Sequence, residues 1–384
     1  MKITKIMMSV SLLGFLALIS VMSFLSPDRD FSENENRYLA DAPTLSLDNI
    51  LDAKFQDGLE EYLNDQIYYR DGWITIKTAI QKAMGDTDIG GAYVGKDGYD
   101  FEKITSDDVD DKLVKKNTKE LKEYLNYCNE SIDASRISVV IVPTSGLVLA
   151  DKLPDYAPLF DQSAYIDSIL SDMQGYNVVD VRDTLISKKD EGVYYRTDHH
   201  WTSKGAFLTY AKWCESMGLA CEEENYTVTT VTNEFRGSLY SKILDHDSAY
   251  DSIECYKKTG SESSFVITLD GKEVDDFYHY DKLEEKDKYL FFFGGNYGEV
   301  VIDKQGEKEL EQERNLLLIK DSFANSFVPF VAEDYDHVYM IDLRYCREDM
   351  RAYLEEHNIT DVMVLYNISN FISDKNIYKL NTGK

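Results

Sequence analysis

The chain is short of basic residues. It has 41 lysines and arginines against 70 aspartates and glutamates in 384 residues, a formal net charge of −29. Proteins bind nucleic acids mainly through lysine and arginine contacts to phosphates, so this balance excludes a nucleic-acid partner. It also disfavours a polyanionic substrate, unless a local basic pocket overrides the overall charge.

Cysteine and proline are scarce as well. Five cysteines are too few for a disulfide scaffold, although Cys214 and Cys221 are close enough in sequence to bridge across a helix end. The sequence has no Cys-x-x-Cys pair and no Cys/His cluster, so nothing in it predicts a zinc site. Six prolines and a composition that is 43% hydrophobic and 12% aromatic are typical of a globular protein with a sizeable core.

Charge is absent altogether from Ile6–Leu25. An apolar run of this length can cross a bilayer core of about 30 Å. Lys2 and Lys5 precede the run and acidic residues follow soon after it, so the positive-inside tendency predicts that the remainder lies outside the cytoplasm. We expect residues 1–27 to be the uncleaved signal anchor of a single-pass cell-membrane protein. A cleaved signal peptide, which would give a secreted product, is the alternative.

Beyond the anchor, the pattern predicts a smaller helical part and a larger α/β part. Residues 28–110 are interpreted as a stalk and a helical N-terminal region, with the helical pattern over Leu47–Met84. In residues 111–384, buried strand patterns alternate with helical ones, which is typical of a mostly parallel sheet with helices on both faces. We expect a β-rich insertion at about 227–310. The main expected strands are Ile137–Val142, Val178–Val181, Phe291–Phe293, Leu316–Ile319, His337–Asp342 and Val362–Tyr366.

Two of the six histidines are adjacent, in the segment Asp198-His199-His200-Trp201 before an expected helix. Residues two apart in an extended segment point the same way. Asp198 can therefore fix the tautomer of the His200 imidazole, while His199 points the other way. A carboxylate and an imidazole paired in this manner are two-thirds of a hydrolase triad.

A serine that can complete the triad follows a predicted buried strand. Leu316–Ile319 runs into a Lys-Asp-Ser sequence that ends at Ser322, where a helix is expected to begin. Sites in open α/β sheets form at the carboxyl ends of strands, and the N–H groups of a first helical turn can face an oxyanion. We predict Ser322 as the nucleophile, His200 as its base and Asp198 as the residue that orients the base. Taken alone, an Asp-Ser pair before a helix is usually only a cap.

These segments together resemble a known family. Asp198-His199-His200-Trp201 matches the signature of the DHHW protein family, and the similarity extends over nearly the whole chain after the anchor. That family looks like a branch of the SGNH-hydrolase-like superfamily, which includes the alginate O-acetyltransferases of bacterial envelopes, and it implies an SGNH-like α/β fold. The other segments that carry the resemblance are Glu35–Leu39, Asn64–Gln66 with Arg70-Asp71, Gly95–Gly98, Pro143-Thr144, Gly294–Asn296, Lys320–Ser322 and Asp342–Arg344.

The resemblance implies a triad in which an Asp-x-His-Trp motif precedes the serine. Carried onto this sequence, it implies Asp198, His200 and Ser322. The order departs from ordinary SGNH hydrolases, where the serine comes first, and a lysine stands where their Gly-Asp-Ser block has glycine. The relatives also place arginine and tyrosine near the site after the serine strand, and Arg344 and Tyr366 are the counterparts implied here.

Three more residues are candidates for contact with a substrate or an oxyanion. Trp201 forms either a pocket floor or sugar-stacking platform, or simply part of the core. Thr144 follows an expected strand and belongs either to a substrate loop or to an ordinary strand exit. Asn296 can offer its amide to an oxyanion, although a hairpin turn explains Gly294-Gly295-Asn296 without any chemistry and is the favoured interpretation.

The sequence therefore predicts an extracytoplasmic Ser-His-Asp esterase or O-acetyltransferase that acts on acylated cell-envelope carbohydrate and uses no cofactor or metal. A transferase needs an acyl supply from across the membrane, which implies a membrane acyl-donor protein as partner, by analogy. The main alternative is a non-catalytic envelope module that binds glycan or protein on the same scaffold. A third interpretation, a metal phosphoesterase, depends on Asp245-His246-Asp247 together with Asp198 and His199.

Overall fold

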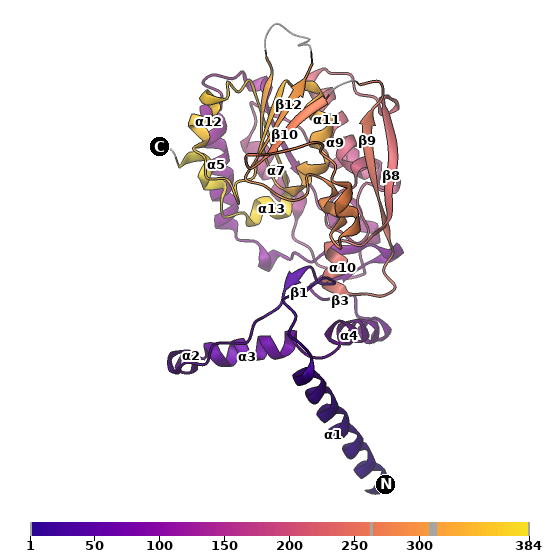
Figure 1. The fold of residues 1–384 in the computed structure, drawn as a ribbon. Coiled ribbons are helices and arrows are strands. Elements are labelled where there is room, and N and C mark those ends of the chain that lie inside the picture. The colour runs from indigo at the N-terminus through magenta and orange to yellow at the C-terminus, as the bar shows by residue number, and fades with distance from the viewer. Residues whose placement is uncertain (1, 262–263, 307–312, 383–384) are drawn as a thin grey trace. The chain divides into compact units, whose positions relative to one another are not determined.

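The computed structural model describes residues 2–261, 264–306 and 313–382 (Figure 1). The chain forms two compact units. One unit contains Met1–Gly90 and Tyr240–Ser248, and the other contains Gly91–Leu239 and Ala249–Lys384.

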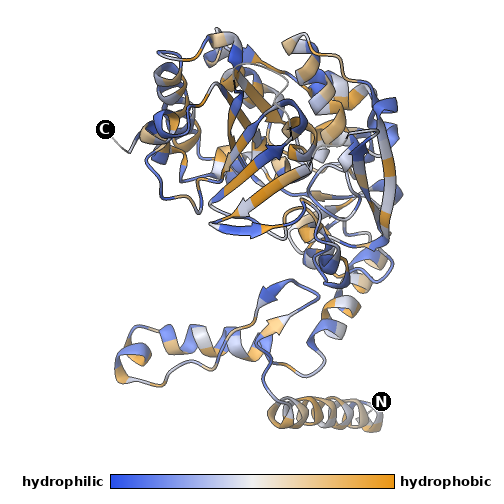
Figure 2. Cartoon of the chain, turned by 45° about the horizontal axis from the view of Figure 1, so that its top comes forward, coloured by the Kyte–Doolittle hydropathy of each residue, from blue (hydrophilic) through white to orange (hydrophobic). Residues whose placement is uncertain are grey.

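The first unit begins with a long apolar helix, α1 (Lys2–Leu25). Within it, Ile3–Leu25 is long and apolar enough to cross a membrane. Hydrophobic residues predominate along it in Figure 2, where it is the helix next to the N label. The helix therefore fits a single-pass membrane anchor or a signal sequence.

The helical pattern over residues 47–84 is divided into three helices. They are α2 (Leu47–Leu51), α3 (Lys54–Asp65) and α4 (Arg70–Met84). Ala53 and Tyr69, which lie between them, have φ values of 59° and 60°, so the backbone cannot continue as one helix. At the end of α3, the buried Asp65 carboxylate accepts two hydrogen bonds from the Arg37 guanidinium, at 2.8 and 2.5 Å. This pair ties the segment that follows α1 to α3.

The second unit is built around one mixed sheet. Its strands are β6 (Ile137–Val142), β7 (Asn177–Val178), β10 (Ser264–Leu269), β11 (Lys272–Val274), β12 (Glu299–Gln305), β13 (Asn315–Lys320), β14 (His337–Ile341) and β15 (Asp361–Asn367). They form an eight-stranded sheet in the order β11-β10-β12-β14-β13-β15-β6-β7. The pairs from β14 through β7 are parallel, and the pairs from β11 to β14 are antiparallel. The expected mostly parallel α/β fold is confirmed.

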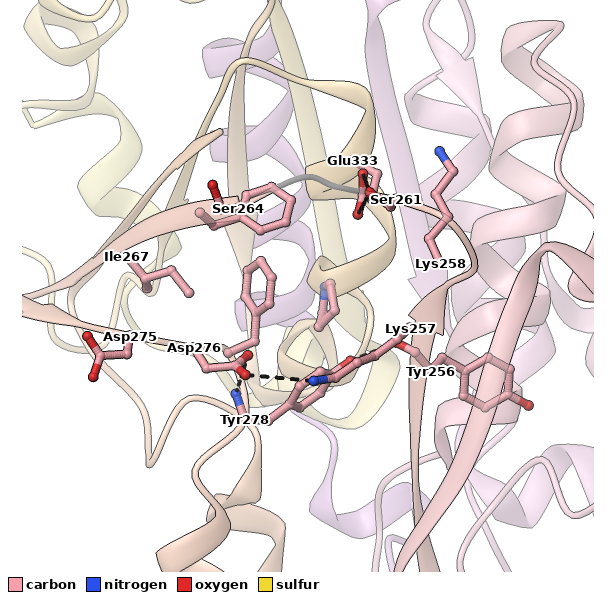
Figure 3. A pocket seen from close by; sticks show the side chains of 13 residues that line it. Tyr256, Lys257, Lys258, Ser261, Ser264, Ile267, Asp275, Asp276, Tyr278 and Glu333 are labelled. Carbon is pink, nitrogen blue, oxygen red and sulfur yellow. Dashed lines mark hydrogen bonds and ion pairs between the residues drawn. The ribbon is translucent and has the colours of Figure 1, made fainter. Parts of the chain in front are cut away.

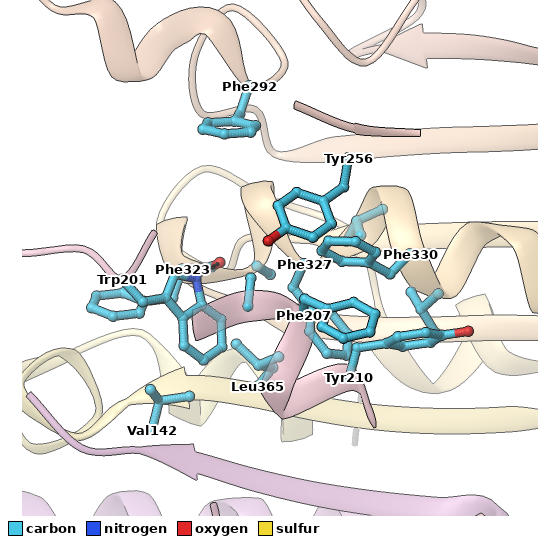
Figure 4. Close-up of a cluster of buried hydrophobic side chains, with 14 of the residues drawn as sticks. Val142, Trp201, Phe207, Tyr210, Tyr256, Phe292, Phe323, Phe327, Phe330 and Leu365 are labelled. Atoms are coloured by element: carbon cyan, nitrogen blue, oxygen red, sulfur yellow. Dashed lines mark hydrogen bonds between the residues drawn. The ribbon is translucent and has the colours of Figure 1, made fainter. Parts of the chain in front are cut away.

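Helices cover both faces of this sheet, because its central strands are apolar on both sides. Along β13, Leu316 and Leu318 belong to one hydrophobic cluster and Leu317 and Ile319 to another. The first cluster contains side chains of α9 (Ser203–Met217) and α11 (Val328–Val331), and Figure 4 shows its aromatic part. The second contains side chains of α5 (Asp111–Cys128), α7 (Gln162–Asp172), α12 (Met350–Glu356) and α13 (Ile368–Ser373).

The β-rich segment contributes to two sheets. β8 (Tyr226–Phe235) and β9 (Asp251–Lys258) form their own antiparallel pair, whereas β10, β11 and β12 extend the main sheet. The remaining elements of three residues or more, apart from the 3-10 turns, are β4 (Ala92–Val94), β5 (Asp100–Glu102), α6 (Ser145–Val148), α8 (Arg182–Ser187) and α10 (Ser238–Ile243). Three two-residue strands, β1 (Phe31–Ser32), β2 (Arg37–Tyr38) and β3 (Asp88–Ile89), complete the set.

Two local expectations were wrong. Of the strand expected at Phe291–Phe293, only Phe292 forms a bridge, to Tyr278. Phe291 ends the 3-10 turn Lys288–Phe291, and Phe293 lies in a turn with a φ of 64°. Of the strand expected at Val178–Val181, only Val178 lies in a strand, as the second residue of β7. Cys214 and Cys221 do not bridge, and all five cysteines, each of which the structure describes, are free thiols.

Candidate functional site

Asp198 and His200 lie in a short loop whose two ends are held together by backbone hydrogen bonds. Tyr194 and Trp201 form an antiparallel bridge, and the N–H of Tyr195 donates to the carbonyl of His200 at 3.3 Å. Inside the loop, Asp198 Oδ1 accepts from the backbone N–H of His200 at 2.9 Å and lies 2.7 Å from its Nδ1. The two side chains therefore meet because the aspartate closes a turn on the backbone two residues on.

Ser322 lies in the turn that follows β13. Asp321 caps this turn, because its Oδ1 accepts from the N–H of Phe323 at 2.9 Å. Its Oδ2 accepts from the N–H of Asn367 and from the amide of Asn370, both at 2.7 Å, and so ties the turn to the end of β15. Ser322–Ser326 is a 3-10 turn that leads into α11, where one short helix was expected.

The three predicted residues lie in contact, although His200 and Ser322 are 122 residues apart in the sequence. His200 Nε2 lies 2.7 Å from Ser322 Oγ, and its Nδ1 lies 2.7 Å from Asp198 Oδ1. All three residues are buried, with Ser322 exposed over 8% of its surface. The imidazole is therefore bonded at both nitrogens, between a carboxylate and a hydroxyl.

Stacked rings enclose the imidazole of His200. The Tyr289 ring lies 3.8 Å away and nearly parallel, at 6°, and the His199 ring lies 3.8 Å away, tilted by 37°. Tyr289 also donates from its hydroxyl to the carbonyl of Ser322 at 3.2 Å. Burial, followed by the neighbouring His199, lowers the pKa of His200 to about 4, despite the Asp198 carboxylate. At neutral pH the ring is therefore a neutral proton acceptor.

The Asp198 carboxylate stays ionised although it is buried. Burial raises its pKa, but the two imidazoles and the hydrogen bonds from His200 and Ser238 outweigh burial and bring the pKa well below its usual range. The N–H of Ser238 donates to Asp198 Oδ2 at 2.8 Å. A fixed negative charge is thus held against the far side of the His200 ring.

The prediction that His199 points away from His200 was wrong. It assumed that this segment is extended. The turn closed by Asp198 brings the two rings to 3.8 Å, and His199 Nδ1 is hydrogen-bonded to Ser238 Oγ at 2.6 Å. Asp198, His199 and His200 also form a set of potential metal donors within 4.8 Å. Both nitrogens of His200 are already bonded, so a metal held by this set would have to displace Ser322 or Asp198.

The other residues of the metal interpretation are engaged elsewhere. Asp245 pairs with Lys82. His246 Nδ1 lies 3.4 Å from Asp247, and both of these side chains are 86% exposed. This arrangement is that of a solvated turn.

The four predicted substrate-binding residues divide into two pairs. Trp201 is fully buried, and its Nε1 donates to the carbonyl of Phe323 at 3.0 Å and to Ser326 Oγ at 2.9 Å, so it supports the serine turn from the core (Figure 4). Thr144 is also buried, where its hydroxyl accepts from the amide of Gln162 at 2.7 Å. The second pair, Arg344 and Tyr366, lines a cavity. This cavity of about 290 Å³ is otherwise lined by Asp321, Asn370, Ser373, Asp374, Lys375 and Asn376.

No local pattern predicted that Lys320 and Asn325 support the serine turn. Lys320 is 1% exposed, and its ammonium donates to Asn325 Oδ1 at 3.1 Å and lies 3.7 Å from Asp342. The amide of Asn325 in turn donates to Asn296 Oδ1 at 3.3 Å. Lys320 therefore stabilises the serine turn through Asn325, and Asn325 also connects Asn296 to this turn.

The structure has a second cavity, of about 260 Å³ (Figure 3). None of the described residues that line it belongs to the triad. Its wall combines aromatic rings, including Tyr256 and Tyr278, with charged groups such as Lys257 and Asp276, which lie 3.9 Å apart. It contains no pair of a nucleophile and a base comparable with Ser322 and His200 among the described residues that line it.

A family model described as DHHW protein matches residues 83–341, more than half of the chain. The chain belongs to the DHHW family. A search of curated proteins finds no match.

Two solved structures share the fold of this DHHW protein. A DHHW family protein from Eubacterium siraeum is 21% identical, with a TM-score of 0.63 over 76% of this chain and 95% of that one. Bacillus cereus PatB1, solved with a sulfonyl adduct, is 20% identical, with a TM-score of 0.62 over 74% of this chain and 96% of that one. The O-acetyltransferase domain of Pseudomonas putida AlgJ is more distant, at 13% identity and a TM-score of 0.47, over 77% of this chain and 99% of that one.

Proposed function

We propose that this DHHW protein is a serine esterase or O-acetyltransferase that acts on acylated cell-envelope carbohydrate. The observation that carries the proposal is the chain of two 2.7 Å contacts from Asp198 through His200 to Ser322. A neutral imidazole in contact with a serine hydroxyl and fixed by a carboxylate is the arrangement that activates serine for attack on an acyl carbonyl.

The reaction proceeds in two steps. Ser322 Oγ attacks the acyl carbonyl as its proton passes to Nε2 of His200, and the same proton then goes to the leaving alcohol as the first ester bond breaks. The resulting acyl-Ser322 is attacked by water or by a sugar hydroxyl, which gives its proton to His200. When the Ser322–acyl bond breaks, His200 returns the proton to Ser322.

Two donors are available for the negative charge on the carbonyl oxygen. The first donor is the backbone N–H of Ser322. Ser322 is the first residue of a helical turn, and the first N–H groups of such a turn have no acceptor within it. Asn296 is held near this turn through Asn325, and its exposed side chain keeps its own amide N–H groups, because the contact uses its oxygen. We assign the oxyanion site to these two groups.

The cavity beside the serine turn fits a hydroxyl-rich ligand. Among the residues that line it are the Arg344 guanidinium, the Tyr366 ring and several carboxylate and amide groups. The Arg344 side chain is 35% exposed and is fixed by two hydrogen bonds to Asp342, at 2.9 and 2.6 Å. Arg344 and Tyr366 are therefore proposed to contact the carbohydrate part of the substrate.

The proposed location follows from α1 and from the charge that precedes it. An apolar helix with lysines before it supports an extracytoplasmic location for the folded part, where envelope carbohydrate lies. If the helix is cleaved as a signal, the protein is secreted. A membrane protein that donates acyl groups is the proposed partner for transfer.

A sulfonyl fluoride tests the nucleophile directly. We expect it to label the wild-type protein once, at Ser322, because the neutral His200 activates this hydroxyl. Ser322→Ala should not be labelled, and Ser187→Ala, at an exposed serine, should be labelled like the wild type. Intact-protein and peptide mass spectrometry give the readout. A folded wild type that takes no label contradicts the proposal and supports the non-catalytic binding module.

The pH dependence of kcat/KM for an aryl acetate tests the base. The reaction needs neutral His200, whose pKa is lowered to about 4, so activity should be lost only as the pH falls through about 4. An ordinary histidine would lose activity near pH 6.5. We expect a plateau from about pH 6 upward, and an acid limb centred near 6.5 in a protein that is still folded would contradict this assignment.

A further inference from the structure

The second histidine of the pair is placed differently from the first. The His199 side chain is 25% exposed, whereas that of His200 is 6% exposed. Their rings are 3.8 Å apart, and the opposite face of His200 is covered by the buried Tyr289. Of the two imidazoles, that of His199 is therefore the one more open to a molecule from solvent.

Ser238 fixes the orientation of His199. Its hydroxyl is 2.6 Å from His199 Nδ1, and its backbone N–H donates to Asp198 at 2.8 Å. One residue thus holds both the carboxylate of the triad and the second imidazole. None of the residues that the structure describes bonds to His199 Nε2, so this atom is the one left for a ligand.

We propose that His199 Nε2 binds the acceptor sugar, so that His199 and Ser238 direct the acyl group to a carbohydrate hydroxyl rather than to water. The proposal rests on the proposed function, since it concerns the second step of that reaction. With the Ser238 hydroxyl donating to Nδ1, the ring proton is on Nε2, which donates to an oxygen of the sugar.

His199 itself takes no proton in this step. The attacking hydroxyl of the sugar gives its proton to His200 Nε2, a new ester bond forms, and the bond between Ser322 and the acyl group breaks. Ser322 then recovers the proton from His200. The hydrogen bond from His199 holds the sugar where its hydroxyl can attack, an advantage that water does not share.

The experiment compares transfer with hydrolysis in one reaction. The purified full-length protein is given an aryl acetate with cellotetraose or chitotetraose, and acetylated sugar and free acetate are measured together with the burst of phenolate. His199→Ala and Ser238→Ala should lower the ratio of transfer to hydrolysis about three- to tenfold, as for the loss of one hydrogen bond. Transfer and hydrolysis both consume the same acyl-Ser322, so their ratio does not depend on how fast each variant forms it, and the burst reports that acylation separately.

Two further variants separate binding from structural damage. His199→Gln keeps an amide donor and should recover part of the transfer, with a lower KM for the sugar than His199→Ala. His246→Ala, at a histidine whose side chain is 86% exposed, should leave the ratio unchanged. An unchanged ratio in His199→Ala, or a wild type that forms acetate alone with both sugars, overturns the inference. A wild type without a burst contradicts the proposed function instead.

Discussion

Replacement of His200 by alanine should reduce turnover of an aryl acetate by about 10²-fold to 10⁴-fold, the usual contribution of a general acid–base group. The ring lies 2.7 Å from both Ser322 and Asp198, so its removal leaves the serine hydroxyl without a base and the carboxylate without its partner. The initial rate of phenolate release, measured with the purified protein at pH 7, gives the comparison.

The matched control for this variant is His246→Ala. That side chain is 86% exposed, so its loss should leave turnover unchanged. Circular dichroism establishes that both variants are folded. Full turnover by folded His200→Ala would remove the base from the mechanism, and with it the reason to regard Ser322 as the nucleophile.

Replacement of Trp201 by alanine should destabilise the second unit by about 3–5 kcal/mol, the usual cost of truncating a buried aromatic side chain. The indole is completely buried, packs against the Phe323 ring at 5.4 Å, and donates to Phe323 and Ser326 in the serine turn. Urea unfolding of the full-length protein, followed by circular dichroism, measures the loss.

Trp201→Phe separates packing from hydrogen bonding. The ring keeps most of its volume but loses the donor, so the buried acceptors of the serine turn are left unpaired and the cost should be about 1–3 kcal/mol. The same variant should also lower the rate of labelling at Ser322, because its turn loses support. A loss below about 1 kcal/mol in Trp201→Ala would mean that the core does not depend on this indole.

The strands of the sheet could be predicted where sequence and burial agree. Apart from Ser138, Ile137–Val142 is a run of apolar, β-branched residues, and β6 has these bounds. Phe291–Phe293 has the same apolar character, yet its rings pack against Tyr278, Tyr289 and Phe277 from a 3-10 turn. A short apolar run shows that a segment is buried, but only tertiary contacts decide its backbone conformation.

The candidate site divides in a similar way. The proximity of Ser322 to the Asp-His pair could be predicted because strands of a parallel sheet end at one edge. The contacts of Tyr289 and Ser238 could not, since both lie in the β-rich segment, where no local pattern indicates a partner 33 or more residues away. The direction of His199 was predicted wrongly because Asp198 hydrogen-bonds the backbone and converts an extended segment into a turn.

The enclosure of His200 between two rings has a kinetic consequence. The His200 ring is stacked at 3.8 Å on both faces and its Nδ1 is bonded to a carboxylate. The ring therefore cannot flip between acylation and deacylation of Ser322. One nitrogen must therefore serve the departing alcohol and the incoming one in the same place, and the two cannot occupy it together. Donor and acceptor should give parallel lines in double-reciprocal plots, the pattern of a ping-pong mechanism, and excess acceptor should compete with the donor.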